Sequence, residues 1–321
     1  MAHPPDVSAF PPGSPIPDGP EWIVSVRPRS LRRSWRRQAL PLLFVLPALL
    51  VYALFVLWPF VNTIHYSLTD WDGAQPVKNF IGLANYRDMF ADPLMWLSLR
   101  HNLIWIALGT LTPVVIGLVL ANLVWSGVKG RTLFRTIFFM PVVLASVVVG
   151  IIWHWIYHPL FGPINVVLRN MGLEQVARGW LGDYDWALYA LLLAGLWAYF
   201  GFCFVILLAA LQGIDMEIHD AAMIDGAGSF KRFWHVTVPQ LAPVLTMLTA
   251  FTLIGGFNVF DIIFVTTKGG PANATDVLAT YTYRQAFTLN EAGYGATLTM
   301  MITVLSLVAS YTFITLRERG Q

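Results

Sequence analysis

Residues 38–69 read QALPLLFVLPALLVYALFVLWPFVNTIHYSLT, and this stretch contains no Asp, Glu, Lys or Arg. A helix needs about 20 predominantly apolar residues to cross the hydrocarbon core of a bilayer. The stretch is long enough for one crossing and too short for two. Its apolar residues run continuously, whereas the strands of a membrane barrel alternate apolar and polar residues. The stretch therefore predicts a membrane-spanning helix near residues 40–61.

Five more stretches of the chain lack these four residue types, at 101–128, 136–168, 186–214, 233–260 and 292–316. Each again has room for one crossing, and helices are favoured because backbone polar groups in lipid must be satisfied within the segment. The corresponding spans are predicted near 101–125, 134–156, 187–212, 241–265 and 295–316. The expected fold is an all-α integral membrane protein with six transmembrane helices within residues 40–316.

The overall composition supports this fold class. Of the 321 residues, 56% are hydrophobic and 12% charged, and the mean hydropathy is +0.61, whereas soluble domains have roughly 25% charged residues. A soluble protein of this length would not bury so much apolar surface. The 20 basic and 18 acidic residues nearly balance, so no nucleic-acid partner is expected. The single cysteine, Cys203, excludes an internal disulfide framework.

The basic residues predict how the spans are oriented, because cytoplasmic loops carry an excess of Lys and Arg. With the N-terminus inside, the cytoplasmic side collects 13 of the 20 basic residues, so both termini are expected in the cytoplasm. Residues 1–39 are expected to form a disordered Pro/Arg-rich tail, and 317–321 a short C-terminal tail. The first apolar stretch is expected to be a retained helix, since no signal-peptide cleavage site follows it.

Motifs of several catalytic sites are missing, because the sequence has no G-x-x-x-x-G-K-[ST], G-x-S-x-G or H-E-x-x-H. His154 and His158 have a spacing that suits a metal, but the aromatic residues around them favour a belt at the membrane interface. We expect neither a catalytic nor a metal site. Ion-coupled secondary carriers usually need ionisable groups at membrane depth, and Asp261 is the one acid within a predicted span. A stand-alone carrier is therefore the less favoured alternative.

The stretch between the fourth and fifth predicted spans, residues 213–240, reads GIDMEIHDAAMIDGAGSFKRFWHVTVPQ. Its first half has an apolar stripe at helical spacing. Gly226 and Gly228 then interrupt the helix, and a second short stripe includes Phe233 and Trp234. The pattern predicts a helix–turn–helix outside the bilayer whose exposed apolar faces dock another protein. Two interfacial helices resting on lipid headgroups are the alternative.

Within this stretch, DAAMIDGA followed by VTVP resembles the EAA loop of ABC importer permeases, whose pattern runs E-A-A, then D-G-A, then Leu-Pro. Asp220 stands where the family has Glu, and Val238 stands where it has Leu. FVTTKGGPANAT, with YTYRQAF beyond it, and FIGLANY at 80–86 are similar to the carbohydrate-type subfamily, which includes the maltose and glycerol-3-phosphate permeases. The resemblance covers most of residues 40–316 and implies a type I ABC importer permease.

The resemblance also implies the partners of the chain, which would itself bind no cofactor and break no bond. It would form half of a translocation pore with a second homologous permease subunit, in a bacterial or archaeal cell membrane. Two ABC ATPase subunits would bind ATP and Mg, and an extracytoplasmic solute-binding protein would deliver a sugar or oligosaccharide. In the family, the EAA loop is the coupling helix that fits a groove on the ATPase. Carried over by position, the coupling residues are Asp220, Ala221, Ala222, Asp225, Gly226, Ala227, Phe233, Trp234 and Pro239.

The candidate substrate residues lie in the fourth and fifth predicted spans. Sugars are usually held by aromatic stacking and a few polar groups in a largely apolar pocket. Asn258 and Asp261 are three residues apart and are expected to share one face of the fifth span, toward a cavity. Trp197, Tyr199 and Phe200 of the fourth span are the candidates for stacking. A glycerol-3-phosphate or polyol importer stays open as an alternative, although no Arg or Lys within a span favours it.

Overall fold

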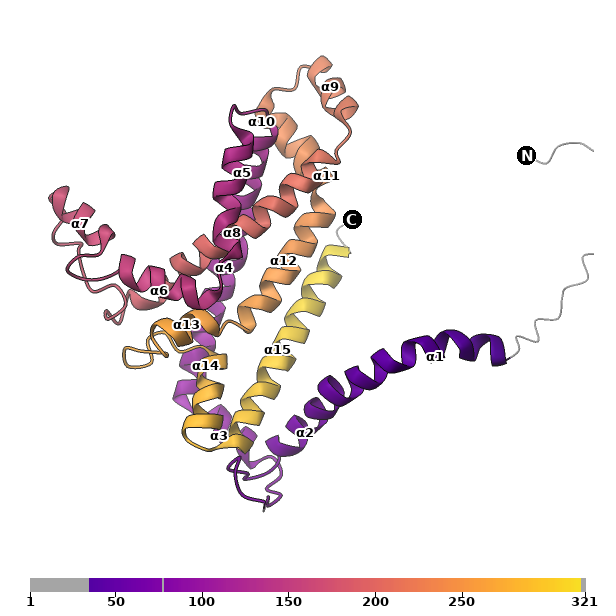
Figure 1. Ribbon diagram of the computed structural model, residues 1–321, viewed down its shortest axis with the longest axis vertical. Helices are drawn as coiled ribbons and strands as arrows, with labels where there is room; N and C mark the ends of the chain where they lie inside the picture. Colours follow the sequence, from indigo (N-terminus) through magenta and orange to yellow (C-terminus); the bar gives the residue numbers. More distant parts are fainter. Residues whose placement is uncertain (1–34, 77, 319–321) are drawn as a thin grey trace, which may run out of the picture. The chain divides into compact units, whose positions relative to one another are not determined.

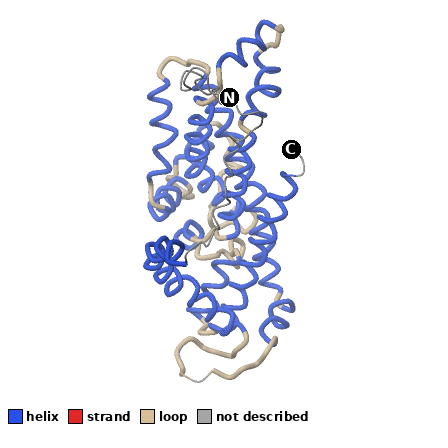
Figure 2. The backbone as a smooth tube through the Cα atoms, turned by 90° about the vertical axis from the view of Figure 1, so that its right-hand side faces the viewer, coloured by secondary structure: helices blue, strands red, loops and turns tan. Residues whose placement is uncertain are grey.

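The structure, a computed structural model, describes residues 35–76 and 78–318. These ranges are built from helices and loops and contain no strand element (Figure 2). The chain divides into two units, 1–58 and 59–321, and each is described by itself. In the first unit, α1 (Trp35–Tyr52) is followed by a short π-helical segment, η2 (Ala53–Leu57). The predicted tail lies outside the described residues except for 35–39, which are helical and begin α1.

The remaining α-helices, in chain order, are α2 (Trp58–Ser67), α3 (Ala84–Ala91), α4 (Pro93–Trp125), α5 (Arg131–Phe139), α6 (Ser146–Ile156), α7 (Pro163–Asn170), α8 (Ala187–Gln212), α9 (Met216–Ile224), α10 (Ser229–Arg232), α11 (Val238–Gln240), α12 (Ala242–Phe257), α13 (Asp261–Thr266), α14 (Leu278–Tyr283) and α15 (Ala292–Glu318). Short 3₁₀ or π-helical segments extend three of these helices: η3 (Met140–Val143), η4 (Phe233–Thr237) and η5 (Arg284–Thr288). Within the second unit, α9 and α10 lie at one end and α3 and α14 at the other (Figure 1).

The prediction of an all-helical membrane protein agrees with the lengths of these helices. Four helices of the described ranges are long and apolar enough to cross a membrane, namely Phe44–Ser67, Pro93–Trp125, Ala187–Gln212 and Ala292–Arg317. Two bent pairs also qualify when each is taken together: Arg131–Val143 with Ser146–Ile156, bent by 102°, and Ser229–Gln240 with Ala242–Phe257, bent by 69°. By length and composition, the described chain therefore has four candidate spans, or up to six if each bent pair is one span.

The third and fifth predicted spans are not continuous helices. In the predicted helix at 134–156, α5 gives way to η3, where Pro141 has no backbone N–H to continue the α-helical hydrogen bonds. Leu144 and Ala145 are then extended and separate η3 from α6. In the predicted span at 241–265, α12 ends at Phe257 and α13 begins at Asp261. Asn258 closes α12 by donating from its side chain to the carbonyl of Ile254, at 2.9 Å. Asn258 and Asp261 thus do not share one helical face, and that prediction is wrong.

The core of the second unit is built on α4 and α8, which pack along each other. Gly117 of α4 permits this approach, because a Cβ atom there would lie 2.8 Å from the backbone nitrogen of Phe204 and 2.9 Å from Cβ of Cys203. Both α8 residues are fully buried. Small residues favour such contacts in membranes, where close van der Waals packing drives helix association. Next, α12 packs on α4, and α15 packs on α12 (Figure 1).

Polar contacts hold the end of the second unit that carries α3 and α14. Asn102 of α4 donates to the carbonyl of Gly256 at 3.0 Å and accepts from the backbone N–H of Leu278 at 2.7 Å, so it joins α12 to α14. Asp276, which is buried, pairs with Arg284 at 2.7 Å. Burial raises the pKa of the Asp276 carboxyl, and the Arg284 guanidinium opposes this shift. The loop between α13 and α14 is therefore tied to the core by several directed bonds.

We predict that Gly117→Leu lowers the thermal stability of the purified protein in detergent. The added side chain would have to push α8 away, and overpacking of this kind costs about 1–3 kcal/mol. A fluorescence or light-scattering melt would show a lower midpoint than the wild type. Gly213→Ala is the matched control, because a Cβ atom there meets only ordinary contact, with its nearest neighbour 3.5 Å away. Equal midpoints for the two variants would refute the close contact of α4 with α8.

Candidate functional site

The stretch 213–240 forms two helices joined by a tight turn. Asp215 caps the start of α9 by accepting a hydrogen bond from the backbone N–H of Glu217, at 3.0 Å. At the other end of α9, the N–H groups of Gly226 and Ala227 donate to carbonyl oxygens of its last turn, which is a Schellman motif. Gly226 has a φ of +77°, a conformation that costs residues with a Cβ atom roughly 1–2 kcal/mol. The turn therefore depends on glycine at this position.

The tip of this stretch exposes large apolar side chains. Ile224 is 87% exposed and Phe230 is 77% exposed, and Trp234 packs edge-on against Phe233 with half of its surface exposed. Of the predicted coupling residues, the exposed ones are Asp220, Ala221, Asp225, Gly226, Trp234 and Pro239, and the half-buried ones are Ala222, Ala227 and Phe233. Exposed apolar surface of this kind marks sites of interaction with another protein or a membrane.

His219 holds α9 against the end of α4, a contact that the sequence pattern did not reveal. The residue is 6% exposed, and its ring lies 5.0 Å from that of Trp125. Its Nε2 atom is buried and has no hydrogen-bond partner among the described residues. Burial lowers the pKa of His219, the positive charge of Arg232 lowers it further, and Asp220 opposes both. The neutral imidazole is therefore the form that fits this position.

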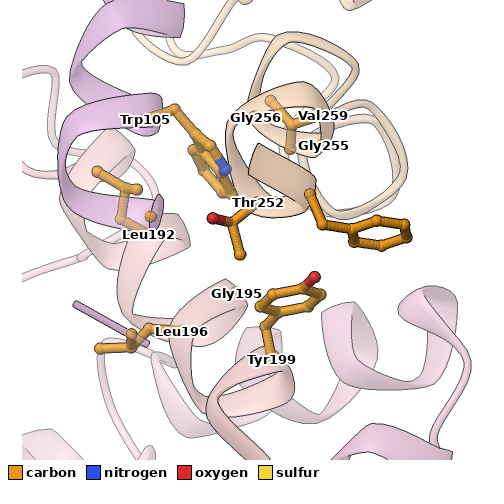
Figure 3. A pocket seen from close by; sticks show the side chains of 11 residues that line it. Trp105, Leu192, Gly195, Leu196, Tyr199, Thr252, Gly255, Gly256 and Val259 are labelled. Atoms are coloured by element: carbon orange, nitrogen blue, oxygen red, sulfur yellow. The ribbon is translucent and has the colours of Figure 1, made fainter. Parts of the chain in front are cut away.

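A cavity of about 260 Å³ lies between α4, α8 and α12 (Figure 3). Trp105, Tyr199 and Thr252 line it from these three helices and face one another across it (Figure 3). Gly195 leaves room for the indole, since a Cβ atom there would lie 3.1 Å from the Trp105 ring. A Cβ atom at Gly255 would meet nothing within 4 Å, so this glycine keeps part of the cavity open. Aromatic walls with a few polar groups are the composition of small-molecule sites.

A second cavity, of about 370 Å³, adjoins the first, and both are lined by Gly195, Tyr199 and Val259. It lies between α6, α8 and the break that separates α12 from α13. Asn258 and Asp261 line it because this break turns both of them toward the same space, although they belong to different helices. The structure thus brings together three of the five predicted substrate residues, Tyr199, Asn258 and Asp261.

The other two predicted residues are half-buried and pack against other rings. Trp197 lies against Trp153, with 5.9 Å between the ring centroids, and Phe200 lies against Phe138 at 6.1 Å. Neither lines the two cavities in the described structure. Residues 197, 199 and 200 point in different directions because successive side chains of a helix are rotated by about 100°. Trp105 and Thr252 were missed, since the apolar sequences of α4 and α12 do not indicate which face borders a cavity.

Residues 113–319 match a protein family described as the binding-protein-dependent transport system inner membrane component. This chain belongs to that family. The match begins inside α4 and includes the stretch 213–240 and most of both cavities. The family resemblance predicted from the sequence is confirmed, and the protein is a permease subunit in the inner membrane. As a member of this family, it is a transport subunit.

Three relatives match this member of the family over most of their lengths. The identity is 35% to the probable ABC transporter permease protein YurN of Bacillus subtilis, covering 86% of this chain and 94% of YurN. The identity is 33% to the lactose transport system permease protein LacF of Rhizobium radiobacter, covering 86% of this chain and 94% of LacF. The identity is 30% to the diacetylchitobiose uptake system permease protein NgcF of Streptomyces coelicolor, covering 92% of this chain and 87% of NgcF.

The fold of this permease subunit is also that of a solved structure. It superposes with a TM-score of 0.76 on a chain in the crystal structure of a bacterial ABC transporter involved in the import of the acidic polysaccharide alginate. The likeness covers 90% of this chain and 98% of that chain, at 21% sequence identity. The comparison establishes an ABC importer permease fold, which confirms the predicted all-helical permease fold.

We predict that Gly255→Leu reduces solute uptake at least ten-fold without loss of protein from the membrane. The leucine side chain would project into the first cavity, and no neighbouring atom would have to move to admit its Cβ. Gly255→Ala is the matched control, because a single methyl group fills little of the cavity. Uptake by cells that express the complete transporter would be compared with the amount of each variant in the membrane. Normal uptake by the leucine variant would place the solute path elsewhere.

We predict that the packing of α9 weakens as the pH falls from 7.5 to 5.5. The pKa of His219 is lower in the folded protein than in the unfolded chain, where it is near 6.5. Above that pH neither state binds the proton, and below it the unfolded loop binds the proton first, so the packed loop loses stability. Limited proteolysis at Lys231 and Arg232 would become faster in acid. His219→Phe keeps a ring against Trp125 and should remove the dependence of the proteolysis rate on pH. Any pH dependence that remains in this variant is that of the protease itself.

Proposed function

We propose that this chain is one of two permease subunits that form the pore of an ATP-driven importer for a sugar or oligosaccharide. The observation that carries the proposal is the turn at Gly226 with its exposed apolar tip at one end of the helical core. A permease needs a surface on which a separate ATPase can act, and this tip has the composition of such a surface. The family match includes the same residues.

Coupling in this proposal is mechanical. The partner ATPase binds ATP and Mg and hydrolyses the nucleotide, and its closure moves α9 as a rigid element. His219 transmits this motion to α4 through its contact with Trp125, and α4 carries Trp105 in the wall of the first cavity. ATP binding would thereby shift the populations of two arrangements of the helices, which open the cavity to opposite sides of the membrane.

A sugar is the substrate class that the two cavities favour. Trp105 and Tyr199 offer aromatic faces, and Thr252, Asn258 and Asp261 offer polar groups. Neither cavity is lined by an Arg or Lys in the described structure, which argues against a phosphorylated polyol. The relatives LacF and NgcF are described as permease proteins for lactose and diacetylchitobiose. Phe251 at the edge of the first cavity is exposed, as expected if a second permease subunit completes the site.

The proposed topology places α9, α10 and both termini in the cytoplasm, because 13 of the 20 basic residues then lie on that side. The end with α3 and α14 then lies outside, where a solute-binding protein delivers the substrate. Lipid contacts the exposed apolar residues of the spans.

We predict that Gly226→Asp lowers uptake at least ten-fold while the partner ATPase still hydrolyses ATP. The substitution strains the left-handed backbone and adds a charge at the docking tip. Gly172→Asp is the matched control, since Gly172 has a φ of +75° and a Cβ atom there, as at Gly226, would meet nothing within 4 Å. Uptake and hydrolysis would be measured on the complete transporter in proteoliposomes.

Two results would contradict the proposed function. Uptake can also fall through simple loss of protein, so the amount of the Gly226→Asp variant in the vesicles is measured first. If the variant is present and imports normally, the tip does not couple the ATPase. If the wild-type chain imports solute with ATP exhausted, the protein is a secondary carrier instead.

A further inference from the structure

A cavity of about 460 Å³ lies at the end of the second unit opposite α9, and the proposed pore does not use it. It lies between α3, the start of α4, the α14–η5 segment and the start of α15. Its polar lining is dominated by four acids, Asp70, Asp88, Asp92 and Glu291. In the topology proposed above, this cavity faces the outside of the cell.

The charge of this cavity is largely uncompensated. No Arg or Lys lines it, and none of its four acids takes part in an ion pair within residues 35–76 and 78–318. Hydrogen bonds from Asn79 lower the pKa of Asp70 and keep it ionised. Two bases lie over rings of the lining: Nζ of Lys78 is 4.2 Å from the centroid of the Trp71 ring, and the Arg284 guanidinium, which pairs with Asp276, is 5.1 Å from that of Tyr281. Four carboxylates therefore line a space in which the described residues offer none of them an ion pair.

A buried side chain of the cavity lacks a partner for one of its atoms. Tyr281 and Tyr294 both donate to Oδ2 of Asp92, and the Nε2 group of Gln285 donates to the Tyr281 hydroxyl at 2.7 Å. Burial raises the pKa of Tyr281 to about 12, so this hydroxyl keeps its proton and fixes which way the Gln285 amide points. Gln285 is 8% exposed, and its Oε1 atom has no hydrogen-bond partner in the part of the chain described.

The chemistry of the cavity selects a cation that donates several hydrogen bonds. Buried acceptors without partners are costly, so Gln285 Oε1 favours an occupant with N–H groups. A metal is not favoured, because the described residues contain no group of three or more His, Cys, Asp or Glu placed to hold one. A guanidinium has five donors in one plane and stacks on aromatic rings. Trp71, Tyr281 and Tyr294 lie in the lining, and the rings of the first two already carry Lys78 and Arg284.

The segments that border the cavity point to a protein as the source of this guanidinium. Phe90 on α3 and Phe287 and Leu289 at the end of η5 do not line the cavity, but they belong to segments that border it, and all three are exposed. Exposed aromatic residues beside an acidic pocket would not help to bind a free ion. Protein interfaces, in contrast, are enriched in aromatic residues and in Arg.

We propose that this cavity receives an arginine side chain of the solute-binding protein when that protein docks on the permease. The inference rests on the proposed function, which supplies the partner and places this end outside the cell. Asp88 and Glu291, whose carboxylates accept no hydrogen bond from the described residues, pair with the guanidinium, and Gln285 Oε1 accepts from it. Asp92, held by the two tyrosines, shapes the wall and adds negative charge.

The test compares docking to the complete transporter in lipid nanodiscs, with the solute-binding protein that supports uptake as the probe. The double variant Asp88→Asn with Glu291→Gln keeps the size of both side chains and should raise the docking Kd at least ten-fold. The wild-type association rate should fall with added salt, and that dependence should weaken in the double variant. Asp185→Asn is the matched control, because Asp185 is an exposed acid in the loop between α7 and α8. An unchanged Kd for the double variant would overturn the inference.

A second arm identifies the arginine. Each arginine on the surface of the binding protein is replaced by Gln, and one such change should weaken docking to the wild-type transporter by a similar factor. Combined with the double variant, it should cause no further loss, because residues in direct contact are not additive. Fully additive losses for every arginine would overturn the proposed pairing.

The remaining outcomes separate this inference from the proposed function and from a metal site. If the binding protein does not dock on the wild-type transporter, the proposed function fails together with the inference. If it docks and stimulates ATP hydrolysis equally on the wild type and the double variant, only the cavity inference fails. Titration with CaCl₂ and MgCl₂ tests whether the cavity binds a metal ion. If the ion competes with docking, and the double variant no longer binds it, the cavity is a cation site instead.

Discussion

The close contact of α4 with α8 at Gly117 is the constraint on which the other features of this permease subunit depend. It holds α4 in place over its whole length, and each functional region has a residue on that helix. Asp92 caps the start of α4 at the acidic cavity, and Trp105 forms a wall of the first cavity. At the end of α4, Trp125 packs against His219. A shift of α4 would therefore displace residues at both ends of the second unit and in between.

The fold was predictable where hydrophobicity alone decides the structure. A long charge-free stretch has no alternative to a helix in lipid, and the predicted span at 187–212 coincides with α8. The predictions failed where local backbone chemistry competes with that rule. Pro141 interrupts one predicted helix and Asn258 ends another. A prediction from the absence of charged residues does not register a single Pro or Asn.

The candidate site was predictable in part for a related reason. A helix that is apolar on every side carries no periodic signal of which face it buries, so neighbouring aromatic residues of α8 could not be sorted by sequence. Tyr199 lines both cavities, whereas Trp197 and Phe200 pack against other rings. The helix–turn–helix of 213–240 was easier to predict, because polar residues separate its glycines and its apolar stripes in the sequence. Its contact through His219 still depended on tertiary packing with Trp125.

The break between α12 and α13 has a consequence for how the subunit can sit among its neighbours. Residues 258–260 interrupt the helical hydrogen bonds within the span predicted at 241–265. Hydrocarbon cannot satisfy the freed backbone groups, and such irregular backbone is tolerated at membrane depth only beside protein or water. The face that carries this break therefore does not contact acyl chains. Three backbone residues thus limit which side of the subunit can face lipid.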